Sequence, residues 1–249
     1  MINLYTAEEI GKIRIACRIV YRVLRKIETL IEPDARTIDI NDEIGRLIRG
    51  EGAAPAFLGY RGYPRESCIS VNEAVVHGIP GNRRLKAGDI VSVDIGVLKD
   101  GFYGDAACTF AVGKINPDAE KLLRVTEESL YLGIERAQQN NRVSDISHAI
   151  QKHIESNGFS VVRAFVGHGI GRDLHEDPQI PNFGLPGRGP RLRSGITMAI
   201  EPMVNAGRHE VVVLDDGWTA VTMDGTLSAH FEHTILVTED QPKILTKIH

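Results

Sequence analysis

The strongest constraint on this chain is that its second half repeats patterns of its first half. The matched pairs are Asp39-Ile40-x3-Ile44-x3-Ile48 with Asp145-Ile146-x3-Ile150-x3-Ile154, Ala56-Phe-Leu-Gly-Tyr60 with Ala164-Phe-Val-Gly-His168, and Gly88 six residues before Asp94 with Gly195 six residues before Glu201. Their spacing is near 107 residues, which is longer than a solenoid repeat. Shared secondary structure with coincidental identities is one explanation. A duplicated half-domain explains all the matches in their order, and we favour it.

Each half is predicted to contain two helices followed by strands. A capping box at Thr6 and Glu9 starts the first helix, which Pro33 ends, and Asn116-Pro117 starts the third. The second and fourth helices are expected over 37–50 and 144–157, and strands over 89–98, 102–112, 196–204, 210–214 and 231–237. The pattern predicts one α+β domain over 1–249, with halves of about 1–112 and 113–249 and helices outside a curved, mainly antiparallel sheet. The segment 178–195 is expected to be irregular.

Composition narrows the function and the compartment. A formal net charge of −4 argues against a nucleic-acid-binding surface. The chain has three cysteines and no C-x-x-C pair, which indicates neither a disulfide framework nor a thiolate zinc site and favours the cytoplasm. No secretory segment and no apolar run of about 18 residues is present, so no membrane association is expected.

Four acidic residues stand within or beside apolar strands. In the predicted hairpin Asp94 and Asp105 share a sheet face, where two close carboxylates repel unless a cation lies between them. The alternative is that one or both are solvated hairpin carboxylates, with Lys99 as a candidate partner. Glu201 and Glu232 each end or interrupt an apolar run, and each is either solvent-facing or compensated by a partner.

The internal repeat brings a histidine into this group. His168 aligns with Tyr60, and Glu201 aligns with Asp94, so we expect both to approach the pseudo-twofold axis. A histidine on a strand is more often structural, but here it would join a cluster of Asp94, Asp105, His168, Glu201 and Glu232. Four carboxylates carry a charge that two divalent cations would cancel. Such a dinuclear site suits Mn²⁺, Fe²⁺, Co²⁺ or Zn²⁺, and a water or hydroxide bridging the metals would make the reaction hydrolytic.

The segments around this cluster resemble the signature motifs of type I methionine aminopeptidases, from the first helix to the last strand. The segments are Leu58-Gly-Tyr-Arg-Gly-Tyr-Pro64, Ser70-Val-Asn-Glu-Ala-Val-Val-His-Gly-Ile-Pro80, Gly167-His-Gly-Ile-Gly-Arg-Asp-Leu-His-Glu176, Ile200-Glu-Pro-Met-Val204 and Phe231-Glu-His233. The resemblance implies the pita-bread fold. It also implies removal of the N-terminal methionine from nascent or newly made chains with a small second residue, by attack of a metal-bridging water or hydroxide on the scissile carbonyl.

The same resemblance implies a role for each residue of the site. Asp94 would bind one metal, Asp105 and Glu232 would bridge both, and His168 and Glu201 would complete the other, with Glu201 also acting as general base. His77 and His175 would contact the substrate amide. The methionine pocket would consist of Tyr60, Tyr63, Cys68 and Trp218, with Phe57 and Leu174 nearby. The chain departs from the common bacterial pattern at Phe57, Leu174 and His230, which affects the pocket volume rather than the reaction.

Two alternatives stay open at this point. One is a proline-directed peptidase of the same fold, which uses a similar ligand set. The other is a non-catalytic binding module, although no metal ligand is missing. The chain starts without the zinc-binding extension of eukaryotic type I enzymes, and the interval from Glu201 to Glu232 is too short for the insertion of type II, which indicates a compact bacterial-type enzyme. A monomer is expected, and contact with the ribosome is undetermined.

Overall fold

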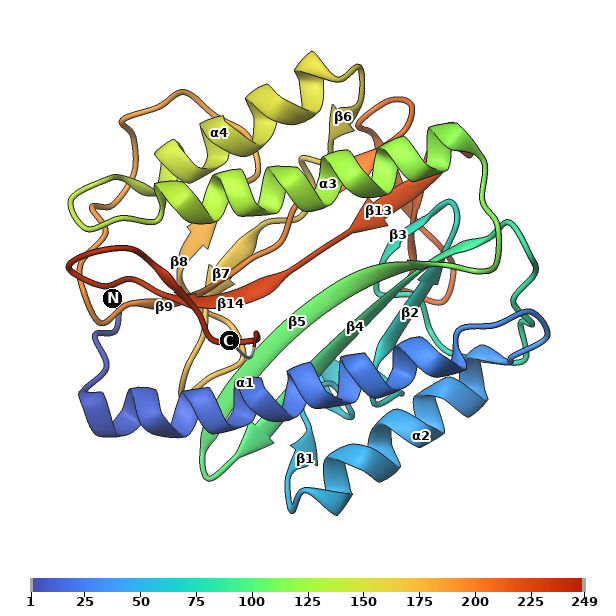
Figure 1. The fold of residues 1–249 in the computed structure, drawn as a ribbon, viewed down its shortest axis with the longest axis horizontal. Coiled ribbons are helices and arrows are strands. Elements are labelled where there is room, and N and C mark those ends of the chain that lie inside the picture. Colours follow the sequence, from blue (N-terminus) through green and yellow to red (C-terminus); the bar gives the residue numbers. More distant parts are fainter. Residues whose placement is uncertain (1, 248–249) are drawn as a thin grey trace.

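Four α-helices frame the molecule in the computed structural model, which describes residues 2–247 (Figure 1). They are α1 Ala7–Ile27, α2 Thr37–Gly50, α3 Pro117–Arg136 and α4 Val143–Ser156. The capping box of Thr6 and Glu9 and the Asn116 cap are both formed, as predicted. The first helix ends earlier than predicted, because a 3-10 turn, η1 (Glu28–Leu30), follows Ile27 before Pro33 is reached.

The strands are short apart from one long hairpin, and every pair is antiparallel. They are β1 Ala54–Pro55, β2 Cys68–Val71, β3 Ala74–Val76, β4 Ile90–Lys99, β5 Phe102–Ala111, β6 Ser160–Val161, β7 Gly167–Gly169, β8 Glu176–Ile180, β9 Thr197–Ile200, β10 Met203–Asn205, β11 Val211–Val213, β12 Ala220–Thr222, β13 Ser228–His230, β14 His233–Leu236 and β15 Lys243–Ile244. The larger sheets run β1-β4-β2 with β5 on β4, and β15-β14-β9-β7-β8. The 3-10 turn η2 (Tyr60–Gly62) lies between β1 and β2.

Two of the predicted strands include residues that lie outside any strand in the structure. The predicted strand 196–204 is divided into β9 and β10 by Glu201 and Pro202, and 231–237 begins with two residues, Phe231 and Glu232, that lie between β13 and β14. The two gaps face each other, since β9 pairs with β14 and β10 with β13. Pro202 has no amide hydrogen to continue a ladder. The segment 178–195 is also less irregular than predicted, because residues 178–180 belong to β8.

The duplication is visible in the backbone contacts. An isolated bridge joins Arg36 to Arg84, and the matching bridge joins Arg142 to Arg191. The amides of Asp34 and Asn140, two residues before each bridge, donate to the carbonyls of Leu85 and Leu192 at 2.8 and 3.0 Å. Coincidental identities would not reproduce these contacts, so the repeat is structural. The exact boundary between the halves, near 112 and 113, stays a prediction.

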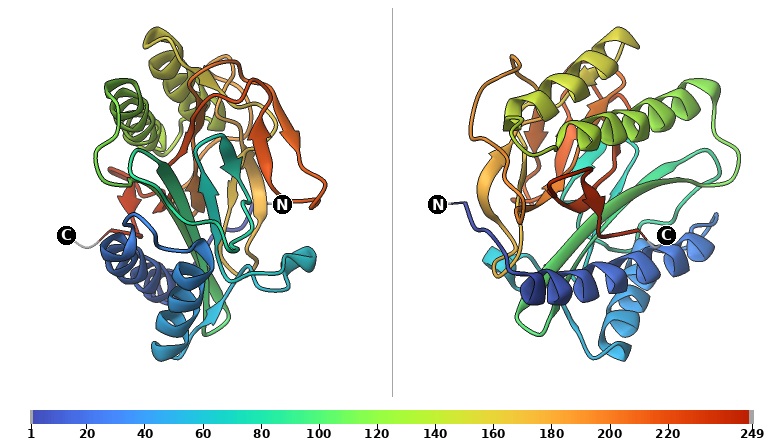
Figure 2. Two further views of the ribbon diagram at one scale, coloured as in Figure 1. Left: turned by 90° about the vertical axis from the view of Figure 1, so that its right-hand side faces the viewer. Right: turned by 60° about the vertical axis from the view of Figure 1, so that its left-hand side comes forward.

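Each half has its own core between its helices and its strands. Ile40, Ile44 and Ile48 of α2 are buried with α1 against β4 and β5, and the equivalent isoleucines of α4 are buried with α3 against β9 and β14. The helices therefore lie on the outside of the strands (Figure 2). Burying each of these side chains contributes about 1.5–3 kcal/mol. Within residues 2–247, no helix is long and apolar enough to cross a membrane.

The two halves meet through a symmetric pair of threonine contacts. The Thr109 hydroxyl donates to the carbonyl of His230 at 2.7 Å and accepts from its amide at 2.9 Å. The Thr234 hydroxyl does the same with Asp105, at 2.7 and 3.1 Å. The pseudo-twofold axis therefore relates Thr109 to Thr234 and Asp105 to His230. Between these contacts, the amide of Glu232 donates to the carbonyl of Ala107 at 2.9 Å.

Candidate metal centre and substrate pocket

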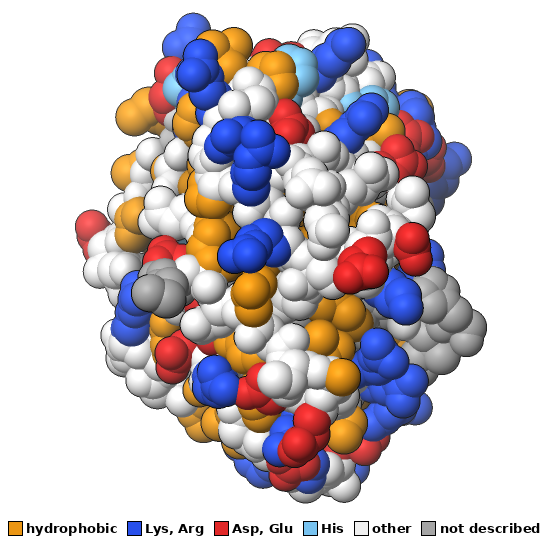
Figure 3. Space-filling view, turned by 90° about the vertical axis from the view of Figure 1, so that its left-hand side faces the viewer, with side chains coloured by type: hydrophobic (Ala, Val, Ile, Leu, Met, Phe, Trp, Pro, Cys, Tyr) orange, Lys and Arg blue, Asp and Glu red, His pale blue; other side chains and the backbone are white. Residues whose placement is uncertain are grey.

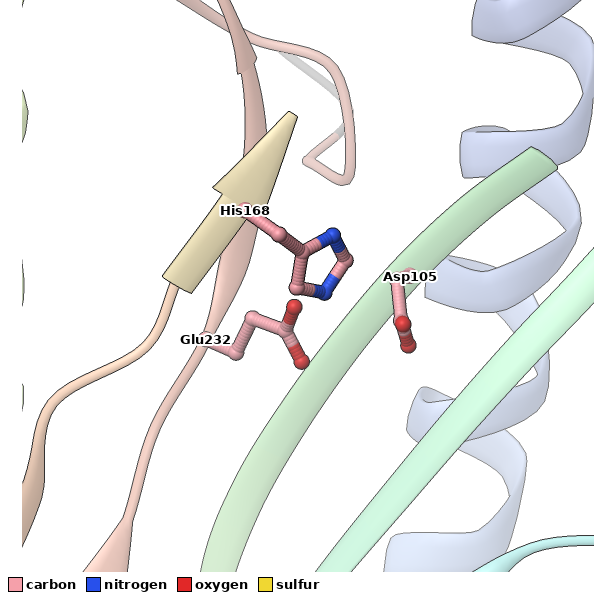
Figure 4. A group of neighbouring side chains, drawn as sticks. All are labelled: Asp105, His168 and Glu232. Carbon is pink, nitrogen blue, oxygen red and sulfur yellow. The ribbon is translucent and has the colours of Figure 1, made fainter. Parts of the chain in front are cut away.

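Five polar residues converge where the halves meet. Asp94 comes from β4, Asp105 from β5 and His168 from β7, while Glu201 and Glu232 occupy the two facing gaps between strands. Ligand atoms of Asp105, His168 and Glu232 all lie within 4.8 Å of one another, and Figure 4 shows these side chains directed at a common point. Asp94 and Glu201 line the same cavity as these three. The structure thus brings together all five residues that the sequence placed in one cluster.

The hairpin register explains how two aspartates come to share a face. Asp94 is opposite Ala107, and Asp105 is opposite Gly96, so the two aspartates are diagonal neighbours across β4 and β5. Burial and then the charge of Asp94 hold the pKa of Asp105 well above its usual range. The alternative of solvated carboxylates paired with Lys99 is wrong, because Asp105 is only 3% exposed, Asp94 Oδ1 is buried, and the Lys99 amine donates to the carbonyl of Gly52.

The cluster fits divalent cations. Asp94 Oδ1, Asp105 Oδ1 and Glu232 Oε1 are buried and accept no hydrogen bond from the described residues. Burial and then Asp105 raise the pKa of Glu232 well above its usual range, and burial raises the pKa of Asp94 to about 7. Buried carboxylates without donors are costly unless a cation compensates them, so both the orphaned oxygens and the raised pKa values indicate ligands for a metal.

Glu201 faces the cluster from the second half. Its Oε1 lies 3.5 Å from His168 Nε2, and burial raises its pKa to about 7 while His168 opposes that shift. His168 Nδ1 lies 2.9 Å from the carbonyl oxygen of Gly169, which favours a hydrogen on Nδ1 and leaves Nε2 as the ligand atom.

An apolar pocket adjoins the cluster within one cavity. Tyr63 is held in this pocket by polar and aromatic contacts. Its hydroxyl lies 3.1 and 3.0 Å from the carbonyl oxygens of Ser67 and Gly78, and its ring packs edge-on against Trp218 with the ring centroids 5.1 Å apart. The predicted pocket residues all line this cavity: Tyr60, Tyr63, Cys68, Trp218, Phe57 and Leu174. Polarizable sulfur and aromatic walls suit an unbranched thioether side chain.

Two histidines stand beside this pocket, as the resemblance implied. His77 follows β3 with a φ of 59°, a left-handed conformation that is uncommon for histidine, and its ring meets Phe165 edge-on at 5.3 Å. His175 stacks on Tyr60, and its Nδ1 lies 2.9 Å from the Tyr60 hydroxyl. Burial lowers the pKa of His77 to about 4 and that of His175 to about 3, so both are neutral at neutral pH.

A contact from the N-terminal segment holds the loop that carries His175. The Tyr5 hydroxyl donates to the Glu176 carboxylate at 2.6 Å and accepts from the amide of Arg172 at 3.0 Å. A side chain on Gly171 would collide with the Tyr5 ring, which explains a glycine there. The loop between β7 and β8 is therefore fastened to the residue that precedes the cap of α1.

Sequence reasoning missed the contribution of two residues to this region. Arg61 lines the cavity, and its guanidinium lies over the Tyr60 ring at 5.3 Å. His230 was noted only as a departure from the family pattern, but its Nε2 lies 3.7 Å from Glu201 Oε2. The position of His230 relative to the pseudo-twofold axis could have indicated this, had the contact of Thr109 with the His230 backbone been known.

Comparison with known proteins decides the family. A model described as metallopeptidase family M24 matches residues 11–239. The chain belongs to metallopeptidase family M24. Among M24 relatives, the methionine aminopeptidase of Clostridium perfringens is 52% identical over 248 residues, covering 100% of both chains. The crystal structure of a methionine aminopeptidase from Thermotoga maritima is 49% identical, with a TM-score of 0.98 over 100% of each chain. The resemblance to methionine aminopeptidases and the pita-bread fold are both confirmed.

The proline-directed members of the family are more distant. A prolidase structure from Pyrococcus furiosus has a TM-score of 0.82 at 24% identity, and the match covers 99% of this chain but 66% of that one. A likeness at this identity shows the shared fold alone. The prolidase structure therefore supports the architecture of the chain and carries no argument about its specificity.

Proposed function

We propose that this chain is a methionyl aminopeptidase, which removes the N-terminal methionine from peptides whose second residue is small. The observation that carries the proposal is that one cavity joins the carboxylate and imidazole cluster to an apolar pocket. The cluster supplies hydrolytic chemistry, and the pocket supplies selection of the first side chain. Identities near 50% to methionine aminopeptidases over the full chain support the same specificity.

The cluster would hold two divalent cations. We propose that Asp94 binds one, that Asp105 and Glu232 bridge both, and that His168 and Glu201 complete the second. When bound, such cations polarise a carbonyl oxygen and lower the pKa of a water molecule. Oxygen-rich ligation with one nitrogen fits Mn²⁺, Fe²⁺, Co²⁺ or Zn²⁺, and availability selects among them.

The protein's own groups would bind and orient the substrate and move its protons. Tyr60, Tyr63, Cys68 and Trp218 would enclose the methionine side chain and exclude water from it. Glu201 would accept a proton from the attacking water and pass it to the departing amine. His77 and His175, neutral beside the pocket, would donate hydrogen bonds to the scissile amide or the oxyanion.

Release of amino acids from two peptides tests the proposal. The peptides begin Met-Ala and Ala-Pro, and the protein is stripped with a chelator and assayed with and without Mn²⁺. Metal-dependent release of methionine alone is the expected result. Release from Ala-Pro alone would assign the chain to the proline-directed branch. Silence on both, with Mn²⁺ binding confirmed by calorimetry, would indicate a binding module.

We further propose that the enzyme works in the cytoplasm as a monomer on newly made chains, with no nucleic-acid or membrane ligand. Its three cysteines are free, which fits a reducing compartment. On the face shown in Figure 3, basic and acidic side chains are interspersed, as on an ordinary solvated surface. Sedimentation of the purified protein with and without ribosomes tests both the monomer and any ribosome contact.

A further inference from the structure

His230 is a buried imidazole without a hydrogen-bond partner at Nε2. The residue is 2% exposed, and no described residue bonds this nitrogen. A buried polar atom left unpaired costs about 1–3 kcal/mol, so its position needs a reason. A carboxylate oxygen close to it, Oε2 of Glu201, lies at 3.7 Å. This separation exceeds the upper limit of an N–H···O hydrogen bond, about 3.2 Å, by only about 0.5 Å.

The backbone of His230 is held in place. The Thr109 hydroxyl bonds both its amide and its carbonyl, and Ser92 Oγ lies 2.8 Å from Thr109 Oγ1. Thr109 and Ser92 are both buried, on the paired strands β5 and β4. The backbone that carries the imidazole is therefore held by buried hydrogen bonds, whereas Glu201 lies between β9 and β10, where its carbonyl accepts from Asn182 Nδ2 at 3.0 Å.

The pseudo-twofold axis identifies the residues of the first half that correspond to Glu201 and His230. It relates Asp105 to His230 through the two threonine contacts, and it relates Asp94 to Glu201 through the sequence repeat. The neighbouring pair Asp94 and Asp105 in the first half thus corresponds to the pair Glu201 and His230 in the second. A carboxylate in place of His230 would add to the negative charge of the four carboxylates in the cluster. An imidazole can donate a hydrogen to Glu201 instead.

We propose that His230 is a positioning residue, whose Nε2–H donates to Glu201 Oε2 and fixes the carboxylate in the orientation needed to bind metal and exchange protons. This inference rests on the proposed function for its catalytic consequence. Its structural content, a donor that orients a metal-binding carboxylate, is testable through metal affinity alone. Partners of this kind behind a metal ligand change affinity or activity about 10–100-fold when removed.

The test compares His230→Leu, which removes the donor, with His230→Gln, which keeps one. We expect His230→Leu to lower kcat at least about tenfold with KM within about threefold, and to weaken Mn²⁺ binding in calorimetry about tenfold. His230→Gln should restore most of both quantities. His153→Leu and His153→Gln, at a histidine on α4 that bonds Glu128, are the matched controls and should leave both quantities unchanged.

Two results would overturn the proposal: wild-type affinity and kcat in His230→Leu, or equal impairment in His230→Leu and His230→Gln. If His230→Leu does not fold, the wild-type protein still decides, because two-bond ¹H–¹⁵N spectra of the chelator-treated protein report which ring nitrogen carries hydrogen. Hydrogen on Nδ1 alone would contradict the proposal. If wild type released no methionine but Mn²⁺ affinity followed the expected order, the proposed function would fail and the positioning role would stand.

Discussion

At the scale of single residues, burial shifts the pKa values of the carboxyls and of the imidazoles at the site in opposite directions. Burial and mutual repulsion raise the pKa of the buried carboxyls, whereas burial lowers the pKa of His77 to about 4. A neutral imidazole adds no positive charge beside cations and retains one N–H to donate. The acidic and imidazole groups are thus suited to the different tasks proposed for them: the carboxylates to holding metals, and His77 and His175 to binding the reacting amide.

Removing His77 should separate catalysis from metal binding. We expect His77→Ala to lower kcat about 10²–10³-fold through loss of a donor to the transition state, with Mn²⁺ affinity within about twofold of wild type. Peptidase kinetics and calorimetry on the same preparation measure the two quantities. His209→Ala, at a half-buried histidine outside the cavity, is the control. Loss of Mn²⁺ binding in His77→Ala would mean that its role is misassigned.

The proposed bridging carboxylates should behave differently from the histidines. Asp105→Ala or Glu232→Ala removes a ligand shared by both cations, so activity should fall below detection and calorimetric titration should show loss of at least one Mn²⁺ per chain. Asp100→Ala, in the exposed turn of the same hairpin, should retain two Mn²⁺ and full activity. Full stoichiometry in Asp105→Ala would remove that residue from the ligand set.

At the scale of elements, close packing of α1 on β5 sets the position of Asp105. Gly104 precedes it, and a Cβ there would lie 2.6 Å from the amide nitrogen of Cys17 and 2.9 Å from the carbonyl carbon of Ala16. These are backbone atoms of α1, which cannot turn aside as a flexible side chain can. The absence of a side chain at residue 104 therefore lets the helix lie directly on the strand that carries a proposed metal ligand.

Gly104→Ala should force the two elements apart. We expect a loss of about 1–3 kcal/mol in the free energy of unfolding, and a Tm lower by roughly 2–10 °C, from the strain of overpacking. Gly11→Ala on the same helix meets nothing within 4 Å and should stabilise by about 0.5–1 kcal/mol, because alanine favours a helix. Thermal unfolding of both variants measures the difference, and a Gly104→Ala protein as stable as wild type would contradict the packing argument.

The elements also show how far the sequence predicts this molecule. Helix starts were predicted from caps, and the shared face of Asp94 and Asp105 from hairpin parity, because both depend on local geometry. The break at Glu201 was not predicted, since its apolar neighbours continue the strand pattern and Pro202 alone indicates an interruption. The contact of His230 with Glu201 depends on the pairing of β13 with β10, which lie far apart in the sequence, and no local pattern encodes that pairing.

At the scale of the whole molecule, the site lies where two separately cored halves join. The contacts that join them, from Thr109 to His230 and from Thr234 to Asp105, flank the carboxylates themselves. Cations bound by residues of both halves would therefore link the halves as well as serve the reaction. Repulsion among the same carboxylates opposes that link when no cation is bound, so the stability of the molecule should depend on metal and on pH together.

The sign of the pH dependence follows from the direction of the pKa shifts. In chelator-treated protein the folded-state pKa is about 7 for Asp94 and Glu201 and well raised for Asp105 and Glu232. These groups bind more protons folded than unfolded, so their contribution is lost as pH rises through the folded values. Histidines with lowered pKa act in the opposite sense, but their contribution is complete above the unfolded value of about 6.5. Between about pH 6.5 and pH 8 the carboxyls therefore dominate.

We expect the Tm of chelator-treated protein to fall as pH rises across that window, and excess Mn²⁺ to raise the Tm more at the upper end than at the lower. The cations favour ionised carboxylates, so they remove the cost that deprotonation imposes. Scanning fluorimetry in chelator and in Mn²⁺ measures both slopes, and Mg²⁺, which tends to retain its waters, tests selectivity for the metal. If the Tm of the chelator-treated protein rose with pH, the four carboxyls would not be buried together as the structure has them. The cations could then not be what links the two halves.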